Sequence, residues 1–499
     1  MLPRVTREAA NRYGDATGYV APGGWALSYT DVDRLSDRVA VGMLDRGVRH
    51  GDVISLVLPP GVEYLVAYLA AAKLGAITAG VNHRLTTAER EAVLAVADPV
   101  LVIDDIERAA SPGDVLADFQ RDGTAPVLPD DPDRAVAIIF TSGTTGLPKG
   151  ALYTERQLAF ITHTDTGDRW GGGTRTFTGT SFAHLGFMTK LPGALMRGGT
   201  TFILERWRAH DCLDLLAREG MTSVAGVPTQ LALMLAEPDF DAFDLSSVQA
   251  IIVGGGPVSP GLATEARARF GAALSTRYSC TEAGIGLGTA FDDPEEDAIV
   301  SVGRPHASVD LAVLDEEDQP VTTGEVGAVC LRSEAVMQGY WHDPEATRSA
   351  FTASGHVRTG DIGWVDDTGR LRLVGRTKEM YVRGGYNVYP VEVEGVLSTH
   401  PAIRAVAVVP RHDPVMGEIG VVVVVSDGPT PTLTDIRGFA AQQLAHHKLP
   451  EAMVPLDALP LTAGDKIDRR ALAALVADEQ MHRSALPRLK PPGTSGARS

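Results

Sequence analysis

The sequence predicts an α/β fold, in which a large N-terminal region is followed by a smaller α+β module. Strand-like apolar segments alternate with helix-like segments up to about residue 375, a pattern typical of parallel sheets covered by helices. Near Gly375 this alternation of strand-like and helix-like segments ends. The chain has 499 residues, and a prior of roughly 150 residues per domain suggests about two to four domains or subdomains.

The first clear elements lie between residues 53 and 82. The run VISLVL, 53–58, predicts a buried strand. The segment PPGVEYLVAYLAAAKLG that follows predicts a helix with proline at its start and Gly75 at its end. The segment AITAGVN, 76–82, predicts the next strand. Because Lys73 and two glycines interrupt the apolar run here, we expect helix then strand rather than a membrane span.

Later segments repeat the succession of strand and loop. AVAIIFTSG at 135–143, SSVQAIIVGGGPVS at 246–259 and LAVLD at 311–315 each predict a strand that leads into a loop. Ligands in parallel α/β folds bind beyond the carboxyl ends of strands. We therefore expect a site near three glycine-rich loops, at 142–146, 254–256 and 284–288.

The second module begins after GRTKEMYVRGG. It reads VYPVEVEGVLSTHPAIRAVAVVP and then GVVVVVS, which predicts a compact α+β domain of about 100 residues. The segment 481–499 ends in a stretch rich in proline, glycine and serine, and we expect it to be disordered.

Composition excludes several classes of protein. A formal net charge of −18 argues against general nucleic-acid binding, which needs a basic face. The three cysteines are widely separated and form no CxxC pair, so a disulfide framework or structural zinc is not expected. The N-terminus has no apolar signal-peptide region, and the predicted location is the cytoplasm.

The segment FTSGTTGLPKG, 140–150, is the first candidate for chemistry. It departs from a Walker loop, because Pro148 stands where the second glycine belongs and Gly150 follows Lys149 in place of Ser or Thr. Its backbone N–H groups, its hydroxyls and Lys149 can nonetheless surround a phosphate. The alternative is an ordinary surface loop, which glycine, serine and threonine clusters often form.

Three further clusters each admit an ordinary alternative. In RYSCTEAG, Thr281 can donate to a phosphate and Glu282 can bind Mg²⁺, although such a pair often begins a helix. Asp361, between two glycines, can accept both hydroxyls of a ribose or simply occupy a turn. Lys466, in LPLTAGDKIDRRAL, is predicted to lie in a loop before a helix, where a lone lysine is usually solvent-exposed.

In order and spacing these motifs resemble one family closely, the adenylate-forming enzymes, which include acyl-CoA synthetases, firefly luciferase and the adenylation domains of peptide synthetases. The resemblance extends from about Leu27 to Leu472 and is greatest to a fatty-acid–CoA ligase. The segments that carry it are FTSGTTGLPKG, YSCTEAG, RTGDIG, GRTKEMYVRGGYNVYPVEVE and KIDRR.

The family fold implies a large N-terminal domain of α/β subdomains with parallel-type sheets and a small mobile α+β C-terminal domain. The boundaries implied here are an AMP-binding domain at 1–375, a hinge at 376–378 and the mobile domain at 379–480, before the predicted tail.

The resemblance also implies an ATP-binding set. The β- and γ-phosphates would be held by Thr141, Ser142, Gly143, Thr144, Thr145, Gly146 and Lys149. The nucleoside would be held by Gly254, Gly255, Gly256, Pro257, Tyr278, Asp361 and Arg376, with Ser279 and Cys280 in the same stretch. Tyr278 would stack on the purine, and Asp361, assisted by Arg376, would bind the ribose hydroxyls.

Catalytic roles follow in the same way. Lys466 would bridge the substrate carboxylate and the α-phosphate, Thr281 would contact that phosphate, and Glu282 together with Thr145 would hold Mg²⁺. His184, in SFAHLGF, matches a gate beside the acyl pocket, with a packed or exposed histidine as the alternative.

The resemblance places the remaining candidates in the C-terminal part of the chain. Lys378 lies at the implied hinge. The CoA-binding residues would be Arg383, Gly384, Gly385 and Tyr386.

Three positions depart from the family pattern. Asp465 stands before Lys466 where glycine is usual, and its carboxylate can either restrain Lys466 or face solvent. Ser279 replaces a glycine, and the gate reads Ser-Phe-Ala-His in place of Pro-x-Phe-His. The last two lie near the expected acyl site, so they bear on substrate identity more than on reaction type.

The leading hypothesis is an ATP-dependent acyl-CoA synthetase that uses Mg²⁺. It would activate a fatty or other apolar acid as acyl-AMP, release pyrophosphate, and transfer the acyl group to CoA. One alternative is a ligase that loads a carrier-protein thiol, which would need a separate partner protein. The other is a non-catalytic nucleotide-binding relative; an oxygenase like luciferase is a further possibility. A homodimer is the default oligomer.

Overall fold

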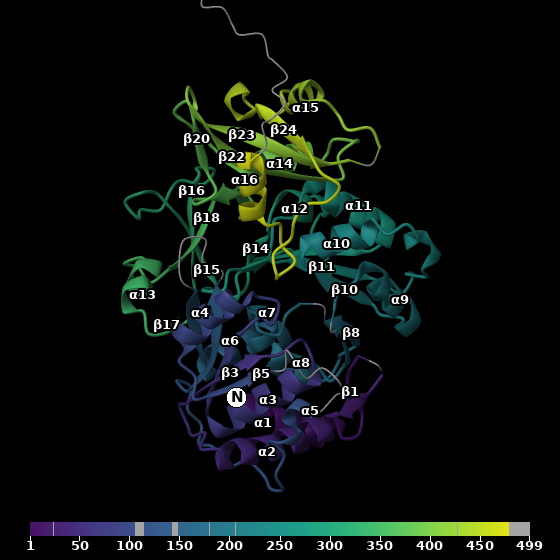
Figure 1. The fold of residues 1–499 in the computed structure, drawn as a ribbon, viewed down its shortest axis with the longest axis vertical. Helices are drawn as coiled ribbons and strands as arrows, with labels where there is room; N and C mark the ends of the chain where they lie inside the picture. Colours follow the sequence, from purple (N-terminus) through teal and green to yellow (C-terminus); the bar gives the residue numbers. More distant parts are fainter. Residues whose placement is uncertain are drawn as a thin grey trace, which may run out of the picture. The chain divides into compact units, whose positions relative to one another are not determined.

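The computed structural model describes residues 1–22, 24–104, 114–141, 148–178, 180–204, 206–426 and 428–478. Contacts divide the chain into two compact units. The first comprises Met1–Val374 together with Ala463–Lys466, and the second comprises Gly375–Thr462 and the chain from Ile467 onward. Figure 1 labels many of the helices and strands of both units.

The first unit contains a mixed sheet with the order β17-β7-β6-β4-β3-β5. Its strands are β3 (Val53–Val57), β4 (Ile77–Gly80), β5 (Leu101–Asp104), β6 (Ala135–Thr141), β7 (Lys149–Thr154) and β17 (Gly339–Tyr340). The pairs that β3, β4, β5 and β6 form with one another are parallel, as predicted, whereas β6 and β7 form an antiparallel hairpin.

A second sheet of this unit has the order β10-β11-β12-β13-β14. Its strands are β10 (Ser223–Gly226), β11 (Ala250–Gly254), β12 (Ala273–Tyr278), β13 (Leu287–Gly288) and β14 (Arg304–Pro305). Because β10, β11 and β12 run parallel, their carboxyl ends share one edge of the sheet.

Two smaller sheets complete the strands of the first unit. One has the order β2-β1-β9-β8 and the other β15-β16-β18-β19. Their strands are β1 (Thr17–Val20), β2 (Ala26–Ser28), β8 (Arg175–Thr178), β9 (Thr200–Ile203), β15 (Asp310–Leu314), β16 (Gly327–Arg332), β18 (Val357–Val365) and β19 (Leu371–Arg376). The segment LAVLD, grouped in the sequence with the parallel strands, instead pairs antiparallel with β16.

Helices cover these sheets. Their bounds are α1 (Leu2–Tyr13), α2 (Tyr29–Asp45), α3 (Val62–Leu74), α4 (Thr87–Ala97), α5 (Asp114–Ala117), α6 (Glu155–Thr166), α7 (Leu185–Met188), α8 (Leu191–Arg197), α9 (Ala209–Glu219), α10 (Pro228–Leu235), η1 (Phe240–Ala242), α11 (Pro260–Phe270), α12 (Glu295–Val300) and α13 (Pro344–Ala350). The N-terminal helix α1 has no counterpart in the prediction; it buries Leu2, Val5 and Ala9 in the core.

The helix α3 is buried on nearly all sides, which explains why its sequence is apolar throughout. It begins at Val62 after Gly61, so the two prolines expected at its first turn lie before it. It ends at Gly75, whose φ of 69° is the left-handed conformation that glycine adopts readily. The buried Lys73 forms ion pairs with Asp33 at 2.6 Å and Asp37 at 2.8 Å, which tie α3 to α2.

The second unit is built on a sheet with the order β21-β20-β23-β22, in which β24 pairs with β23. Its elements are β20 (Tyr381–Arg383), β21 (Tyr386–Val388), α14 (Pro390–Leu397), β22 (Ala405–Asp413), β23 (Gly417–Val425), α15 (Leu433–Ala440), η2 (His446–Lys448), β24 (Ala452–Pro455) and α16 (Arg469–Asp478). In Figure 1 these helices surround the sheet.

Alternation along β23 shows why its valine run is continuous. Val422 and Val424 belong to the cluster that includes α14 and α15, whereas Val421 and Val423 pack with Leu472 of α16. Successive side chains on a strand point to opposite faces, so a strand covered on both faces needs apolar residues at every position.

None of the helices within the described residues is both long enough and apolar enough to cross a membrane.

Candidate functional site

The β6–β7 hairpin frames the predicted phosphate loop. Thr141 pairs with Lys149 at the base of the connection, and Phe140 pairs with Gly150 next to them. The predicted loop residues Ser142, Gly143, Thr144, Thr145 and Gly146 lie outside the described residues. The described hairpin therefore places Thr141 and the exposed Lys149 directly opposite each other, one at each end of the loop.

Tyr340 links Lys149 to Glu282. The Lys149 ammonium lies 5.1 Å from the centroid of the Tyr340 ring, and the Tyr340 hydroxyl donates a hydrogen bond of 2.7 Å to Glu282 Oε1. Burial, and then the charge of Glu282, raise the pKa of Tyr340, so its hydroxyl stays protonated and acts as a donor. Lys149, predicted to bind phosphate, and Glu282, predicted to bind Mg²⁺, therefore both contact Tyr340.

Sequence reasoning missed Tyr340, which lies in the unremarked stretch MQGYW. Its position depends on β17, a short strand that pairs Tyr340 with Ala151 of β7. In the same stretch the Met337 amide donates to the Glu282 carbonyl at 2.9 Å. A two-residue strand leaves no periodic signal, so only the fold brings Tyr340 to Glu282.

Thr281 and Glu282 lie in a turn after β12, which rules out the alternative that they begin a helix. The Tyr153 hydroxyl, from β7, donates to the Thr281 carbonyl. The two larger sheets of the first unit are therefore joined at the point where the Thr-Glu pair lies.

Tyr278 and Asp361, predicted as the nucleoside residues, are in direct contact. The Tyr278 hydroxyl donates to Asp361 Oδ2 at 2.7 Å, and only 6% of Asp361 is exposed. Asp361 also follows Thr359, whose side-chain oxygen accepts from the Asp361 amide at 3.1 Å. Burial, and then the charge of Asp361, raise the pKa of Tyr278, so the phenol remains a donor that holds the carboxylate in place.

The segment Gly254–Pro257 follows β11, beside the end of β12. A side chain at Gly254 would place its Cβ 2.6 Å from the Arg277 carbonyl oxygen, so only glycine lets the two strands approach this closely. Gly255 has a φ of 80°, which again favours glycine. The carboxyl ends of β11 and β12 therefore bring the predicted adenine segment next to Tyr278.

Ser279 and Cys280 occupy the turn after Tyr278. The Ser279 hydroxyl donates to the Cys280 carbonyl at 3.2 Å. Burial, followed by the charge of Glu282, raises the pKa of the Cys280 thiol, so this group remains a neutral thiol rather than a thiolate nucleophile.

The segment Ala463–Lys466 belongs to the first unit, although its flanks belong to the second. Asp465 forms an ion pair with Arg84 at 2.7 Å, and the exposed Lys466 follows it. The sequence left open whether the Asp465 carboxylate restrains Lys466 or faces solvent. Because the structure pairs Asp465 with Arg84, far away in the chain, its carboxylate does not merely face solvent.

His184 is the N-cap residue of α7, and the charge of Lys466 acts on its imidazole. Burial, and then the charge of Lys466, lower the pKa of His184 from 6.5 to about 4, so its imidazole is neutral at pH 7. It lies beside an aromatic cluster in which Phe182 and Phe187 stack at 3.7 Å and Tyr64 meets both edge-on. An uncharged histidine next to aromatic rings suits an apolar acyl group.

The remaining predicted residues belong to the second unit, which begins at Gly375 within β19. Arg376 ends β19, and Lys378 follows it; both are exposed. The predicted CoA segment forms a hairpin in which Arg383 pairs with Tyr386 across Gly384 and Gly385.

Both glycines of this hairpin have positive φ, 55° and 88°, as a tight hairpin turn requires. Tyr386 is 58% exposed and stacks on His447 at 4.5 Å, whereas Arg383 forms an ion pair with Glu451.

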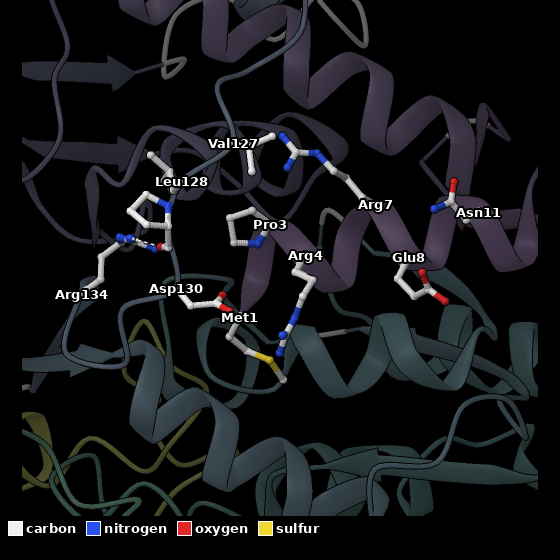
Figure 2. A pocket seen from close by; sticks show the side chains of 11 residues that line it. Met1, Pro3, Arg4, Arg7, Glu8, Asn11, Val127, Leu128, Asp130 and Arg134 are labelled. Carbon is white, nitrogen blue, oxygen red and sulfur yellow. Dashed lines mark hydrogen bonds between the residues drawn. The ribbon is translucent and has the colours of Figure 1, made fainter.

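A surface cavity of about 370 Å³ lies elsewhere in the first unit, between α1 and residues 127–134. Figure 2 shows Arg4 and Arg7 from the helix and Arg134 from the segment opposite. No predicted site residue lines this cavity. Arg134 donates to the Pro129 carbonyl at 2.6 Å, a contact that holds its own loop.

Comparisons with known proteins cover nearly the whole chain. Residues 6–341 match the AMP-binding enzyme family, and residues 392–466 match the AMP-binding enzyme C-terminal domain. The chain is 32% identical to the feruloyl-CoA synthase of an Amycolatopsis species over 467 residues, which cover 90% of this chain and 94% of that protein.

A second relative is the fatty acid–acyl-carrier-protein ligase ScoC of Streptomyces coeruleorubidus, 31% identical over 475 residues, with 90% of this chain and 91% of ScoC covered. Among solved structures, ATP-bound MatB from Rhodopseudomonas palustris has a TM-score of 0.85 at 26% identity and covers 96% of this chain and 99% of MatB. The chain therefore belongs to the AMP-binding enzyme family, and it is an AMP-forming acid–thiol ligase of the acyl-CoA synthetase type.

Proposed function

We propose that this enzyme activates an apolar carboxylic acid as acyl-AMP and then transfers the acyl group to the thiol of CoA. The observation that carries the proposal is the contact chain from Lys149 through Tyr340 to Glu282. It joins a cation at the phosphate loop to a carboxylate of the kind that binds Mg²⁺, at the place where two anionic reactants would have to meet.

The residues divide the work of the first half-reaction. Tyr278, fixed on Asp361, orients the nucleoside, and Asp361 accepts the ribose hydroxyls. Lys149 neutralises the outer phosphates, and Lys466 bridges the substrate carboxylate and the α-phosphate. Attack by the carboxylate then forms the acyl–phosphate bond and breaks the bond to pyrophosphate. This step needs charge stabilisation and positioning more than proton transfer.

Glu282 fits a magnesium ion that is shared with substrate. Among the described residues no group of three or more His, Cys, Asp and Glu side chains could hold a metal by itself. Mg²⁺ commonly uses one or two carboxylates and completes its shell with waters and substrate phosphates. When bound, the ion would neutralise phosphate charge; Glu282, held by Tyr340, is the described residue that would contact it, and Thr145 is the second proposed ligand.

We propose the class of acid, namely a carboxylic acid with an apolar tail. One relative is named for ferulate and another for a fatty acid, so the comparisons support both an aromatic and an aliphatic tail. The neutral His184 and the aromatic cluster beside it support an uncharged tail of either kind. The name of ScoC also supports keeping the carrier-protein thiol as the second candidate acceptor.

For the second half-reaction we propose a hinge at 376–378 and domains at 1–375 and 379–480. The division of contacts between Val374 and Gly375 supports this boundary. The exposed hairpin at Gly384 and Gly385 would allow the CoA arm to approach the backbone closely. The free cysteines, Cys212, Cys280 and Cys330, support a cytoplasmic location.

One assay tests the proposal: pyrophosphate release across a library of aliphatic and aromatic acids, with ATP and Mg²⁺, and with CoA, a holo-carrier protein or neither. We expect acid-dependent release and a thioester that forms with CoA. A thioester that forms only on the carrier protein would move the proposal to the second candidate. Absence of acid-dependent pyrophosphate release with every acid and every acceptor would overturn it and favour a non-catalytic nucleotide-binding protein.

A further inference from the structure

The loop that carries Lys466 is held at both ends and at its tip. An isolated antiparallel bridge between Leu461 and Ile467 closes its neck. The four residues Ala463–Lys466, which form its tip, belong to the first unit by their contacts. The side chain that anchors this tip is Asp465, at the position where the resembling family usually has glycine.

Asp465 has a backbone conformation that favours glycine, and its carboxylate binds Arg84 and Gln230. Its φ is 58°, in the left-handed region that favours glycine and that Asp and Asn tolerate best among other residues. One carboxylate oxygen pairs with Arg84 Nη1 at 2.7 Å, and the other accepts a longer hydrogen bond of 3.4 Å from Gln230 Nε2. Aspartate therefore retains the loop conformation and adds two contacts that glycine lacks.

Both partners of Asp465 are themselves positioned. Gln230 is buried, with 1% exposed, and its side-chain oxygen accepts from the Val227 amide at the start of α10. Asn82 accepts from the Arg84 amide at 3.0 Å, and its side-chain nitrogen donates to the Ala463 carbonyl at 3.4 Å. The loop tip therefore contacts the buried Gln230 and Asn82, and the Asn82 side chain fixes the backbone of Arg84.

The anchors come from the two largest sheets of the first unit. Asn82 and Arg84 follow the carboxyl end of β4, and Gln230 follows the carboxyl end of β10. Ligands of parallel α/β folds bind at such ends. Asp465, directly before Lys466, therefore contacts residues that follow the carboxyl ends of parallel strands in both sheets.

We propose that Asp465 is a positioning residue, a latch that binds Arg84 and Gln230 so that Lys466 stays at the reacting carboxylate while acyl-AMP forms. This inference rests on the role that the proposed function gives to Lys466. The ion pair is partly open to water, with 49% of the Arg84 side chain and 17% of the Asp465 side chain exposed. A contact of that kind biases a loop only a few-fold, so the latch can also release.

The test measures the two half-reactions separately in wild type, Asp465→Asn and Arg84→Ala. Asparagine keeps the tolerance for positive φ and a hydrogen-bond acceptor for Gln230, but it removes the charge that pairs with Arg84. We expect each variant to slow acyl-AMP formation about three- to fivefold, the upper part of the range for a partly exposed ion pair. Thioester formation from supplied acyl-AMP should be unchanged or faster, because release of the latch favours that step.

Two further variants test whether Asp465 and Arg84 act through their shared contact or whether each substitution merely disturbs the fold. The double variant Asp465→Asn with Arg84→Ala should be no slower than either single variant, because both remove the same contact. Arg84→Lys, which keeps the charge, should restore part of the rate. High salt should narrow the difference between wild type and Asp465→Asn, since the ion pair is partly exposed.

The chain offers a matched control in Asp318. It has a φ of 61° and forms an ion pair with Arg358 at 2.6 Å, in the turn that follows β15. Asp318→Asn removes the same kind of contact at the same kind of backbone position, away from Lys466. Both half-reactions should stay within about twofold of wild type in this variant.

Each contrary result has a distinct meaning. If Lys466→Ala abolishes acyl-AMP formation while Asp465→Asn and Arg84→Ala leave it unchanged, the latch is wrong and the proposed function stands. If Asp465→Asn slows both half-reactions equally, Asp465 supports structure alone and the latch is again wrong. If Lys466→Ala itself leaves acyl-AMP formation intact, the failure lies in the proposed role of Lys466.

Discussion

At the scale of single residues, the site depends on hydroxyl groups that hold carboxylates. Tyr278 donates to Asp361 and Tyr340 donates to Glu282, each at 2.7 Å. A hydrogen bond to a charged group is worth about 1.5–3 kcal/mol, more than one between neutral groups. The sequence predicted both carboxylates and Tyr278, but not Tyr340, because a residue that only contacts a predicted one carries no motif of its own.

Tyr340→Phe tests this arrangement. The variant keeps the ring beside Lys149 and removes the bond to Glu282. We expect acid-dependent pyrophosphate exchange to fall about tenfold or more and to need more Mg²⁺, because the Glu282 carboxylate is no longer oriented. Tyr68→Phe is the control, since it removes a buried hydroxyl that donates to the Met188 carbonyl. An unaltered magnesium dependence in Tyr340→Phe would contradict the assignment.

His184 gives a prediction for pH. Its pKa is about 4 in the folded chain against 6.5 for the free group, so between these values the unfolded chain binds a proton that the folded chain does not. Stability that depends on His184 is therefore lost as the pH falls from about 6.5 towards 4. Urea unfolding should show a shallower acid loss for His184→Phe than for wild type.

The same replacement at His412, which is exposed, is the control for the pH series. Equal acid loss in wild type and His184→Phe would show that the His184 pKa is not lowered in the folded protein.

At the scale of elements, the apolar pattern of the chain predicted where strands and helices lie, but it did not predict how all the strands pair. The buried strands β3 and β4 and the helix between them lie where apolar runs and Gly75 indicated. One predicted strand pairs differently from the expectation, since β15 is antiparallel to β16, and β7, which the sequence did not predict, is antiparallel to β6. Strand direction depends on which distant segment a strand meets, and apolar periodicity contains no information about that partner.

Gly254→Ala tests the close approach of β11 and β12. The new Cβ would lie 2.6 Å from the Arg277 carbonyl oxygen, so the backbone of β11 or β12 would have to shift next to Tyr278. We expect the KM for ATP to rise about tenfold, because overpacking of this kind costs about 1–3 kcal/mol.

Gly256→Ala is the matched comparison. Its Cβ would meet only Pro228 side-chain atoms, at 3.5 Å, an ordinary contact. We expect a smaller effect on the KM than in Gly254→Ala, and equal effects in the two variants would show that the strand approach is not what matters.

At the scale of the whole molecule, chain segments far apart meet in one functional unit. Asp465 and Arg84 are separated by 381 positions, yet they form an ion pair. No local pattern encodes that contact. The sequence therefore showed that Asp465 departs from the family pattern, but it did not predict what the carboxylate binds. The order of the motifs predicted the family and the reaction, whereas the contacts between motifs required the fold.

The proposed hinge gives a prediction at this scale. Proline at Lys378 restricts the backbone, so Lys378→Pro should spare acyl-AMP formation and slow thioester formation by about tenfold or more. Lys378→Ala, which removes the charge but keeps the backbone free, should support both steps. Thioester formation at the wild-type rate in Lys378→Pro would show that the hinge does not lie at this position.

The most direct measurement is the isolation of the mixed anhydride from enzyme, ATP, Mg²⁺ and an active acid without CoA. Wild type should accumulate acyl-AMP, and Lys466→Ala should make none while still converting supplied acyl-AMP and CoA to the thioester. A wild-type enzyme that yields no acyl-AMP with any acid, or a Lys466→Ala variant that loses both steps equally, would contradict the account.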